Sequence, residues 1–378
     1  MDFDLTDDQR LLSDSVNRLL GDQYSFEKRK AYLKAPEGWS TGLWAQYAEL
    51  GLLGLPFAEE YGGFGGGAVD VMLLMQAFGR HLVLEPYLST VVLGGTAIKL
   101  AGNSAQQSEI LPGITEGSTK LAFAHSERQS RYDITDVLTT AKANGGGYVL
   151  EGAKSVVLHG DSADKLIVSA RTSGARDDAG GISLFLVDGS AAGLARRGYT
   201  LRDGSRAAEI SLSGVHVAKG DVLGEVDNAL GVIERVMEAG IAATAAEVIG
   251  TMETMQAMTL DYLKTRVQFG KPIGENQALQ HRAAEMLVAM EQGRSMAMLA
   301  AMMVEEPDAA ERARNISMAK VGVGQAGRFV SQNAVQLHGG IGMTEEYAVG
   351  HFFRRVMVIE HLFGDTAYHL DRLADQVD

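Results

Sequence analysis

The sequence predicts an α+β protein with several domains: N-terminal helices, a β-rich middle and a long helical C-terminal bundle. Apolar residues recur with helical spacing between residues 11 and 20, and again from about residue 229 to the end. Between them, from about residue 120, short apolar runs alternate with Gly and Asp, as in strands joined by turns. We therefore expect an N-terminal helical domain at 1–118, a middle β domain at 119–218 and a C-terminal four-helix bundle at 219–378.

The N-terminal part carries a helix start signal, because Thr6 and Gln9 have the spacing of a capping box. A second helical pattern runs through Trp44 and Tyr47 and breaks where Gly and Pro appear. The glycine run at 62–67 lacks the Lys-Ser/Thr pair of a phosphate-binding P-loop. We therefore expect that run to be a plain loop.

The middle part predicts a small antiparallel barrel or sandwich, because its strand-like runs are short and evenly punctuated. Examples are the runs at 148–151 and 182–187. The following segment at 230–270 is rich in Ala and Met, which favour helices. The Met cluster between residues 286 and 303 has roughly helical spacing and predicts a bundle core.

Composition excludes several classes of function. The 34 Lys and Arg against 48 Asp and Glu give a net charge of −14, which argues against nucleic-acid binding. The absence of Cys excludes disulfides, thiolate catalysis and Cys-type metal sites, and His338 has no partner histidine at ligand spacing, so we expect no metal. The acidic N-terminus lacks an apolar signal core, and no run of apolar residues is long enough to span a membrane. We expect a cytoplasmic protein with no membrane contact.

The densest motif is the stretch at 262–273, YLKTRVQFGKPI. Tyr262 and Arg266 lie four residues apart and so share one helix face, while Gly270 and Pro272 stop the helix. A cation at a helix end beside an aromatic ring suits a cofactor that carries a pyrophosphate. By itself the pattern also fits an ordinary capped helix.

A second motif follows about seventy residues later, at 336–347, and reads QLHGGIGMTEEY. Its glycines allow a ligand to approach the backbone closely. The two motifs in this order and at this separation resemble the acyl-CoA dehydrogenase family, with its R-x-x-F-G-x-x-[IL] and Q-x-x-G-G-x-G-x-x-x-E signatures. The order of helices, β module and long helices also resembles that family's fold over nearly the whole chain.

The resemblance implies an FAD-dependent dehydrogenase that introduces an α,β double bond into an acyl-CoA. It implies that a carboxylate removes the α-proton, that a hydride leaves the β-carbon for flavin N5, and that an electron-transfer flavoprotein accepts the electrons. In that family we expect one motif to come from each of two neighbouring subunits. The residues implied for FAD are Arg266, Gln268, Phe269, Gln277, Gln336, Gly339, Gly340, Ser126 and Thr366, and those for the substrate are Tyr132 and Tyr262.

The middle domain departs from the family pattern. The segment that matches T-E-P-x-A-G-S-D reads SERQSRYD at 126–133, so bulky and charged residues replace its small centre. Ser126 keeps the hydroxyl expected beside the flavin, and Tyr132 replaces the serine expected near CoA. Val156 and Leu158 stand where the family has the Trp and Thr that hold the flavin ring. Val156 and Leu158 either contact the flavin in place of the Trp and Thr, or they belong only to the core of the β domain.

The catalytic base is the largest departure. Counting from Arg355 places Gly364 where the family often has its glutamate, and Gly240 stands at the alternative helical position. Asp365 lies one residue after the position of that glutamate. Glu247 lies in an apolar helical run, where burial is expected to raise the pKa of a carboxyl. Both acids are candidate bases, and each also has a structural interpretation, as a turn residue or as a salt-bridged helix residue.

The tail LFGDT at 362–366 and the segment at 125–133 resemble the small subunits of bacterial pimeloyl-CoA-type dehydrogenases. That resemblance implies either a homotetramer or a heterotetramer with a homologous larger subunit, which then supplies the base. Two alternatives stay open. The chain is a catalytically silent subunit that completes the FAD site of its partner, or it is a flavin oxidase or monooxygenase relative.

Overall fold

A computed structural model describes residues 5–375, and the acidic residues 1–4 at the N-terminus lie outside that range. The chain divides into two compact units. The first comprises Met1–Leu33, Gly67–Val83 and Ile241–Asp378, and the second comprises Lys34–Gly66 and Leu84–Gly240. The N-terminal helices are therefore shared between the two units. The three expected domain boundaries stay a prediction.

The first unit contains the N-terminal helices α1 (Asp7–Gln23), α2 (Phe26–Tyr32) and α4 (Ala68–His81). The predicted capping box is present, because Thr6 accepts a hydrogen bond from the Gln9 backbone and Gln9 bonds back to the Thr6 N–H. Helix α4 lies directly against the part of α7 (Leu230–Thr265) that belongs to the same unit, from Ile241 onward. A Cβ added at Gly79 would fall on the backbone carbonyl of Glu247, so glycine permits this close approach.

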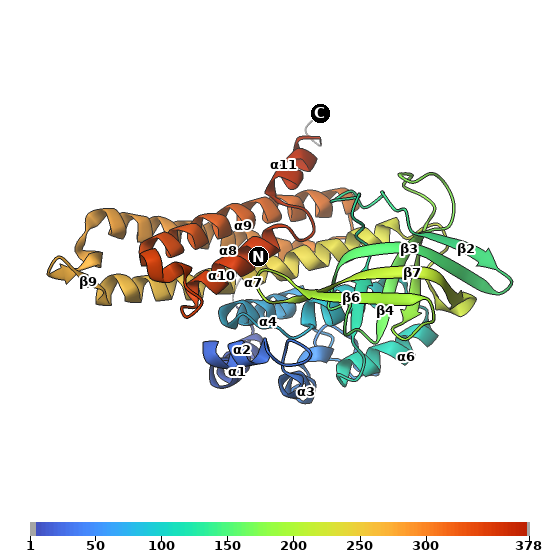
Figure 1. Cartoon of the computed structure of the whole chain (residues 1–378), viewed down its shortest axis with the longest axis horizontal. Coiled ribbons are helices and arrows are strands. Elements are labelled where there is room, and N and C mark those ends of the chain that lie inside the picture. Colours follow the sequence, from blue (N-terminus) through green and yellow to red (C-terminus); the bar gives the residue numbers. More distant parts are fainter. Residues whose placement is uncertain (1–4, 376–378) are drawn as a thin grey trace. The chain divides into compact units, whose positions relative to one another are not determined.

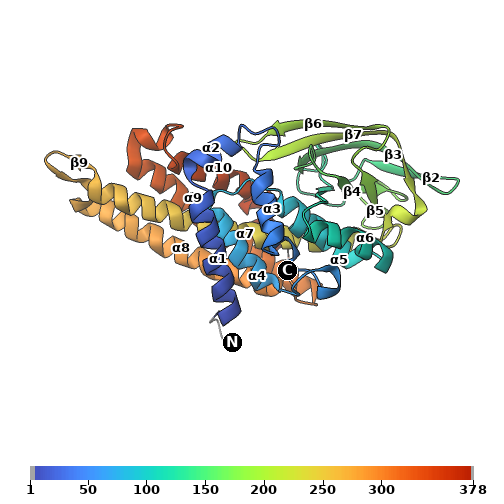
Figure 2. The ribbon, with the colours of Figure 1, turned by 90° about the horizontal axis from the view of Figure 1, so that it is seen from below.

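The rest of the first unit is the predicted helical bundle. It is built from α7, α8 (Gln277–Met303), α9 (Ala309–His338) and α10 (Val349–Glu360), followed by the short α11 (Thr366–Ala374). Helices α7, α8 and α9 run side by side over most of their length (Figures 1 and 2). Their facing sides form one apolar core, and the predicted methionine core is confirmed at Met286 and Met290. Such burial is the main source of stability for long helices.

One end of the bundle carries the segments that hold the two motifs. The hairpin of β9 (Val267–Gln268) and β10 (Lys271–Pro272) connects α7 to α8 through the 3-10 turn η5 (Ile273–Glu275). The 3-10 turn η6 (Gly339–Met343) directly follows α9. The hairpin projects beyond the helix ends (Figure 1). Both connections are therefore placed by rigid helices of the same unit.

The second unit is built on one sheet with the strand order β6-β7-β3-β2-β4-β5-β8, and β1 pairs with β4. Most neighbours are antiparallel, as predicted, but β1–β4 and β2–β4 are parallel, so the sheet is mixed. Strand β3 has register shifts, one of them between Lys154 and Val157. The strands are β1 (Leu121–Ala124), β2 (Thr140–Asn144), β3 (Gly147–Leu158), β4 (Lys165–Arg171), β5 (Ile182–Asp188), β6 (Leu194–Thr200), β7 (Arg206–Ala218) and β8 (Val222–Leu223).

Helices also belong to the second unit. They are α3 (Thr41–Glu49), η1 (Leu52–Gly54), η2 (Glu59–Tyr61), the π-helical η3 (Leu88–Gly94), α5 (Gly95–Ala101), α6 (Ser104–Thr115) and η4 (Lys219–Asp221). The glycine run at 62–67 is a loop, as predicted. Within residues 5–375, none of the helices combines the length and the apolar character that crossing a bilayer demands.

Candidate functional site

The two motifs line one cavity of about 450 Å³ at the end of the bundle. Tyr262, Arg266 and Gln268 come from the end of α7 and the hairpin, and Gln336 and Gly339 come from the end of α9. Whether two subunits share the complete FAD site stays a prediction, but residues of both motifs reach this cavity from one chain. The physical reason is that α7 and α9 are neighbours in the bundle and end at the same place.

Positive φ angles shape both walls of the cavity. Phe269 and Gly270 have φ of 54° and 80°, which turns the hairpin back so that the Ile273 N–H donates to the Arg266 carbonyl at 2.9 Å. Gly339 has φ of 65° and stops α9 directly after the motif's histidine. Glycine adopts such angles without strain. These backbone turns therefore fix the positions of the backbone segments that carry Arg266 and Gln336.

The cavity is cationic and has one aromatic side. Within residues 5–375, the exposed side chains of Arg266 and Arg282 have no hydrogen-bond or ion-pair partner. The ring of His338 lies between Tyr262 and Tyr347, at centroid distances of 4.7 and 5.1 Å. Burial lowers the pKa of His338, so this ring stays neutral at neutral pH.

This chemistry fits FAD. Two unpaired guanidinium groups suit the pyrophosphate of a dinucleotide, and the aromatic side and the amide side chains suit its ring and sugar groups. Sequence reasoning missed Arg282, which lies on α8 within two turns of its start. The signal was available, because Arg282 is the first arginine after the hairpin. Five of the predicted FAD residues do not line the cavity: Phe269, Gln277 and Gly340 lie next to it in the sequence, and Ser126 and Thr366 lie elsewhere in the chain.

Phe269 lies at the tip of the hairpin and is fully exposed. Gln277 is the first residue of α8, and Gly340 follows the lining residue Gly339. These residues border the cavity in sequence. Their role in binding FAD stays a prediction.

The first candidate base, Glu247, is engaged in a buried ion pair. The side chain of Arg355 donates to both of its carboxylate oxygens, from Nε at 2.6 Å and from Nη2 at 2.8 Å. Glu247 is 2% exposed. Both carboxylate oxygens are therefore occupied by one guanidinium, and neither is free to meet a substrate. The geometry favours the structural interpretation of Glu247 over the catalytic one.

The second candidate, Asp365, is the N-cap of α11. Its side chain accepts the backbone N–H of Tyr368 at 2.9 Å. The preceding Gly364 has φ of 97°, and a Cβ built there would lie 2.5 Å from a ring carbon of Tyr368 and 2.7 Å from Nε2 of His369. No side chain fits at position 364 in this conformation. Thr366 lies in the same turn, with its hydroxyl buried beside Gly324 and away from the FAD cavity.

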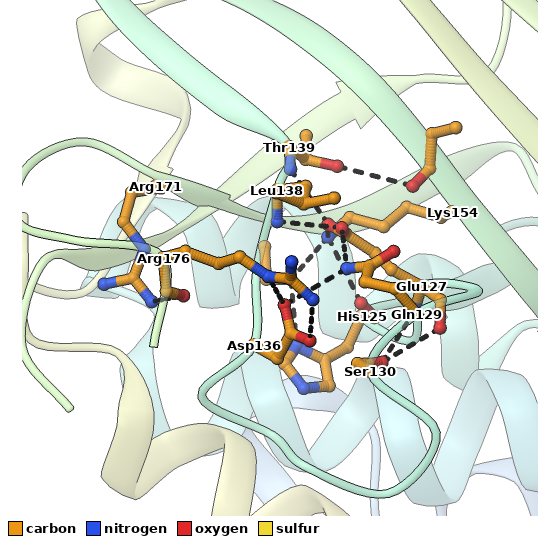
Figure 3. A network of polar contacts seen from close by, with 12 residues as sticks. His125, Glu127, Gln129, Ser130, Asp136, Leu138, Thr139, Lys154, Arg171 and Arg176 are labelled. Atoms are coloured by element: carbon orange, nitrogen blue, oxygen red, sulfur yellow. Dashed lines mark hydrogen bonds and ion pairs between the residues drawn. The ribbon is translucent and has the colours of Figure 1, made fainter. Parts of the chain in front are cut away.

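A buried ion pair also organises the second unit, between Glu127 and Lys154 at 2.7 Å (Figure 3). Glu127 additionally accepts the backbone N–H groups of Leu138 and Thr139, and Lys154 also donates to Ser169. Burial raises the pKa of the Glu127 carboxyl, but the Lys154 ammonium and these hydrogen bonds outweigh it and hold it at about 2. The pair is therefore ionised at neutral pH.

An outer layer extends this network. Gln129 donates to Glu127 and to Asp136, and Arg176 forms an ion pair with Asp136 (Figure 3). Together the two layers hold the segment at 127–139 against the sheet. That segment contains the stretch in which the sequence departs from the family pattern.

The remaining predicted residues lie around this network. Ser126 is half-buried, and its carbonyl accepts the Ser155 N–H at 2.8 Å. Val156 has φ of 53° at the β3 irregularity and points to solvent. Tyr132 is half-buried and Leu158 is likewise partly covered. The network thus brings Ser126 close to the strand that carries Val156 and Leu158.

The described residues offer no metal centre, because no group of three or more His, Asp or Glu side chains in 5–375 is placed to hold an ion.

Three family models match the chain. They describe the acyl-CoA dehydrogenase N-terminal domain at residues 6–118, the middle domain at 122–215 and the C-terminal domain at 230–377. An acyl-CoA dehydrogenase of Bacillus subtilis is 30% identical over 325 residues, which cover 82% of this chain and 82% of the relative. The caffeyl-CoA reductase-Etf complex subunit CarC of Acetobacterium woodii is 29% identical over 312 residues, with 81% and 82% covered.

Among solved structures, a variant of the Tcur3481-Tcur3483 steroid ACAD is similar, with a TM-score of 0.88 and 28% identity. The match covers 98% of this chain and 97% of that one. The matched domains follow the same order as the helical, β and helical segments described above. The chain therefore belongs to the acyl-CoA dehydrogenase family of FAD-dependent oxidoreductases, which act on a CH–CH bond of an acyl-CoA.

Proposed function

We propose that this chain is one subunit of a heteromeric acyl-CoA dehydrogenase, and that the carboxylate which accepts the α-proton comes from a homologous partner subunit. FAD supplies the hydride acceptor for this chemistry when it is bound. The contribution of this chain is to hold the cofactor, through Arg266, Arg282 and Gln336, and to shape the rest of the site. An electron-transfer flavoprotein is the proposed electron acceptor.

One observation carries this proposal: the two candidate bases, Glu247 and Asp365, already have hydrogen-bond partners within the chain. Glu247 is bound at both oxygens by Arg355, and Asp365 caps a helix. A general base must have a free oxygen within reach of the proton that it removes. The cavity with the FAD motifs is open by contrast, so cofactor binding is retained where a base is lacking.

The names of similar proteins support an assembly of this kind. The steroid ACAD structure is named for two components, and CarC is named as a subunit of a complex with Etf. The tail at 362–366 and the segment at 125–133 resemble small subunits that pair with larger homologues. The proposed assembly is therefore a heterotetramer, with a homotetramer as the outcome that would contradict it.

The experiment compares the chain alone with the chain co-expressed with a larger homologue from a neighbouring reading frame. Each preparation is scanned for flavin absorbance, and a series of acyl-CoA thioesters is added without oxygen. We expect acyl-CoA to bleach the flavin of the complex and not that of the lone chain. Full bleaching by the lone chain, undiminished in Glu247→Gln and Asp365→Asn, would show that no partner is needed.

A second candidate function follows from the same occupied acids, Glu247 and Asp365. The chain would then be a catalytically silent subunit whose cavity completes the FAD site of its partner. Flavin content separates the two. If each chain holds its own catalytic FAD, the complex contains one FAD per chain. If the chain only completes the partner's site, the content is one FAD per pair of chains, and Arg266→Ala in this chain removes it.

A further inference from the structure

The turn between α10 and α11 is held by one face of α9. Ser317, Lys320 and Gly324 lie at helical spacing on α9. Lys320 bonds to the turn itself, while Ser317 and Gly324 face the helices on either side of it, at His369 of α11 and at Glu360 and Thr366. Lys320 Nζ donates to the carbonyls of Ile359 and Leu362, at 2.8 and 3.0 Å. A buried ammonium that binds two carbonyls at the C-terminal end of α10 fixes where the turn begins.

His369 holds the other side of the turn from within α11. Its ring is completely buried. Nδ1 lies 3.1 Å from the Ser317 hydroxyl, and Nε2 lies 2.9 Å from the Phe363 carbonyl. A neutral imidazole satisfies both contacts when Nε2–H donates to Phe363 and Nδ1 accepts from Ser317. The ring thus bridges α9 and the residue just before Gly364.

The ring also fills the space that a side chain at position 364 would need. A Cβ there would lie 2.7 Å from Nε2 and 3.0 Å from Cδ2 of His369, as well as 2.5 Å from Tyr368. With φ of 97°, the backbone itself already favours glycine. The glutamate of the family is therefore excluded by the conformation of the turn and is not simply replaced at one position.

We propose that His369 is a positioning residue which packs against Gly364 and fixes the turn at 361–365, so that position 364 cannot carry a catalytic carboxylate. This inference deepens the proposed function and rests on it, because it explains why the base has to come from another chain. It predicts that position 364 and His369 are energetically coupled. It also predicts that glycine at 364 is required by the ring as well as by the backbone.

A double-mutant cycle on the FAD-loaded protein, in its native assembly, tests the coupling. The variants are Gly364→Ala, His369→Ala and the pair together, and the measurement is the melting temperature. We expect Gly364→Ala to lower it by several degrees in the wild-type background and by clearly less in the His369→Ala background, where the ring is absent. Equal losses in both backgrounds would overturn the proposal.

Gly145→Ala is the matched control for backbone strain. Gly145 has φ of 57°, but nothing lies within 4 Å of a Cβ built there. We expect Gly145→Ala to lower the melting temperature less than Gly364→Ala does, and by the same amount with and without His369. If Gly364→Ala is as mild as Gly145→Ala, the ring does not fix the turn.

The imidazole resonances of His369 give a readout that mere loss of packing would not reproduce. In the wild type we expect a neutral ring at pH 5.5 with a hydrogen-bonded Nε2 proton. In Gly364→Ala we expect that proton signal to be lost and the ring to titrate near the ordinary range of histidine. An unchanged spectrum in that variant would overturn the proposal. Failure of the proposed function appears separately, as acyl-CoA that leaves the flavin of the wild-type complex unbleached.

Discussion

Two regions of the helical bundle differ in whether their polar side chains have hydrogen-bond or ion-pair partners. At the FAD cavity, Arg266 and Arg282 face outward and have no partner within residues 5–375. Deeper in the bundle, Glu247 and Arg355 form a buried pair, and at the turn at 361–365 Lys320 and His369 bind backbone carbonyls. Unpaired cations at a cavity are available to a ligand, whereas saturated buried pairs are part of the fold.

This difference shows where the chain has kept the family's chemistry and where it has replaced it. The cavity end keeps both signature motifs, and their side chains are exposed. The turn carries Gly364 at the position predicted for the glutamate, beside a buried histidine with both ring nitrogens occupied. Two polar atoms beside the turn are nevertheless unsatisfied, because Oε2 of Glu360 and Oγ1 of Thr366 are buried without a hydrogen-bond partner among the described residues.

Breaking the buried pair should have the largest effect. Arg355→Ala leaves the Glu247 carboxylate buried without its partner, which typically costs about 3–5 kcal/mol of unfolding free energy. Urea unfolding followed by far-UV circular dichroism measures the loss. The neighbouring Arg354 pairs with the exposed Glu345, so Arg354→Ala should cost no more than about 1 kcal/mol. Similar losses in the two variants would mean that the Glu247 pair does not stabilise the bundle.

Acidification should weaken the turn at 361–365 next. Burial lowers the pKa of His369 to about 4, below the ordinary value of 6.5. The unfolded chain therefore takes up a proton on this residue before the folded chain does, and stability falls as the pH drops from about 6.5 toward 4. The total loss is about 3 kcal/mol at about 1.4 kcal/mol per pH unit.

The same argument applies to His125 in the other unit, because burial lowers its pKa to about 3. Urea midpoints measured between pH 7 and 4 in the wild type and in His369→Gln separate the two histidines. We expect His369→Gln to have a shallower pH dependence, with the remaining slope due to His125 and other groups. An unchanged slope would mean that His369 is not held neutral by the turn.

The sequence made the cavity predictable and left the turn unpredictable, for physical reasons. Both motifs act through local geometry, because α9 ends at Gly339 and Gly270 turns the hairpin that follows α7. The expectation that Gly270 and Pro272 stop the helix is wrong, since α7 already ends at Thr265. The partner of Glu247 lies 108 residues away, and no periodicity reveals such a pairing. The parallel β1–β4 pairing and the position of Arg282 beside the hairpin are also long-range results of packing.

The motif count predicts that Gly364 stands where the family often has its glutamate, and the assignment stays a prediction. It gave no sign that His369 occupies that space, because a histidine five residues later reads as an ordinary helix residue. Asp365 likewise gave a carboxylate near the expected position, while its role as a helix cap depends on where α11 begins. An acidic residue near an expected catalytic position is thus easily taken for the base when its hydrogen-bond partners are unknown.

At the open end, Arg266→Ala should reduce FAD affinity and leave folding almost unchanged. Loss of a hydrogen bond to a charged group is worth about 1.5–3 kcal/mol, or roughly ten- to a hundredfold in the dissociation constant. Because Arg266 has no partner in the described chain, its removal should change the unfolding free energy by less than about 0.5 kcal/mol. Fluorescence titration of the apoprotein with FAD and urea unfolding give the two values.

Arg282→Ala should behave similarly, whereas Arg314→Ala, an exposed arginine on α9 outside the cavity, should not alter FAD binding. Retention of full FAD affinity in both Arg266→Ala and Arg282→Ala would place the cofactor somewhere other than this cavity. Loss of folding in either variant would show that these side chains are structural after all.

The smallest effect should come from Asp365, and it separates a cap from a base. Asn caps a helix about as well as Asp, whereas Ala does not and costs about 1 kcal/mol. If Asp365 only accepts the Tyr368 N–H, Asp365→Asn keeps both stability and the rate of flavin reduction by acyl-CoA, and Asp365→Ala loses only the stability. If it is the base, Asn abolishes proton transfer as completely as Ala does, because an amide cannot take up the α-proton. Stopped-flow reduction of the complex with both variants therefore decides whether the turn at 361–365 takes part in the chemistry.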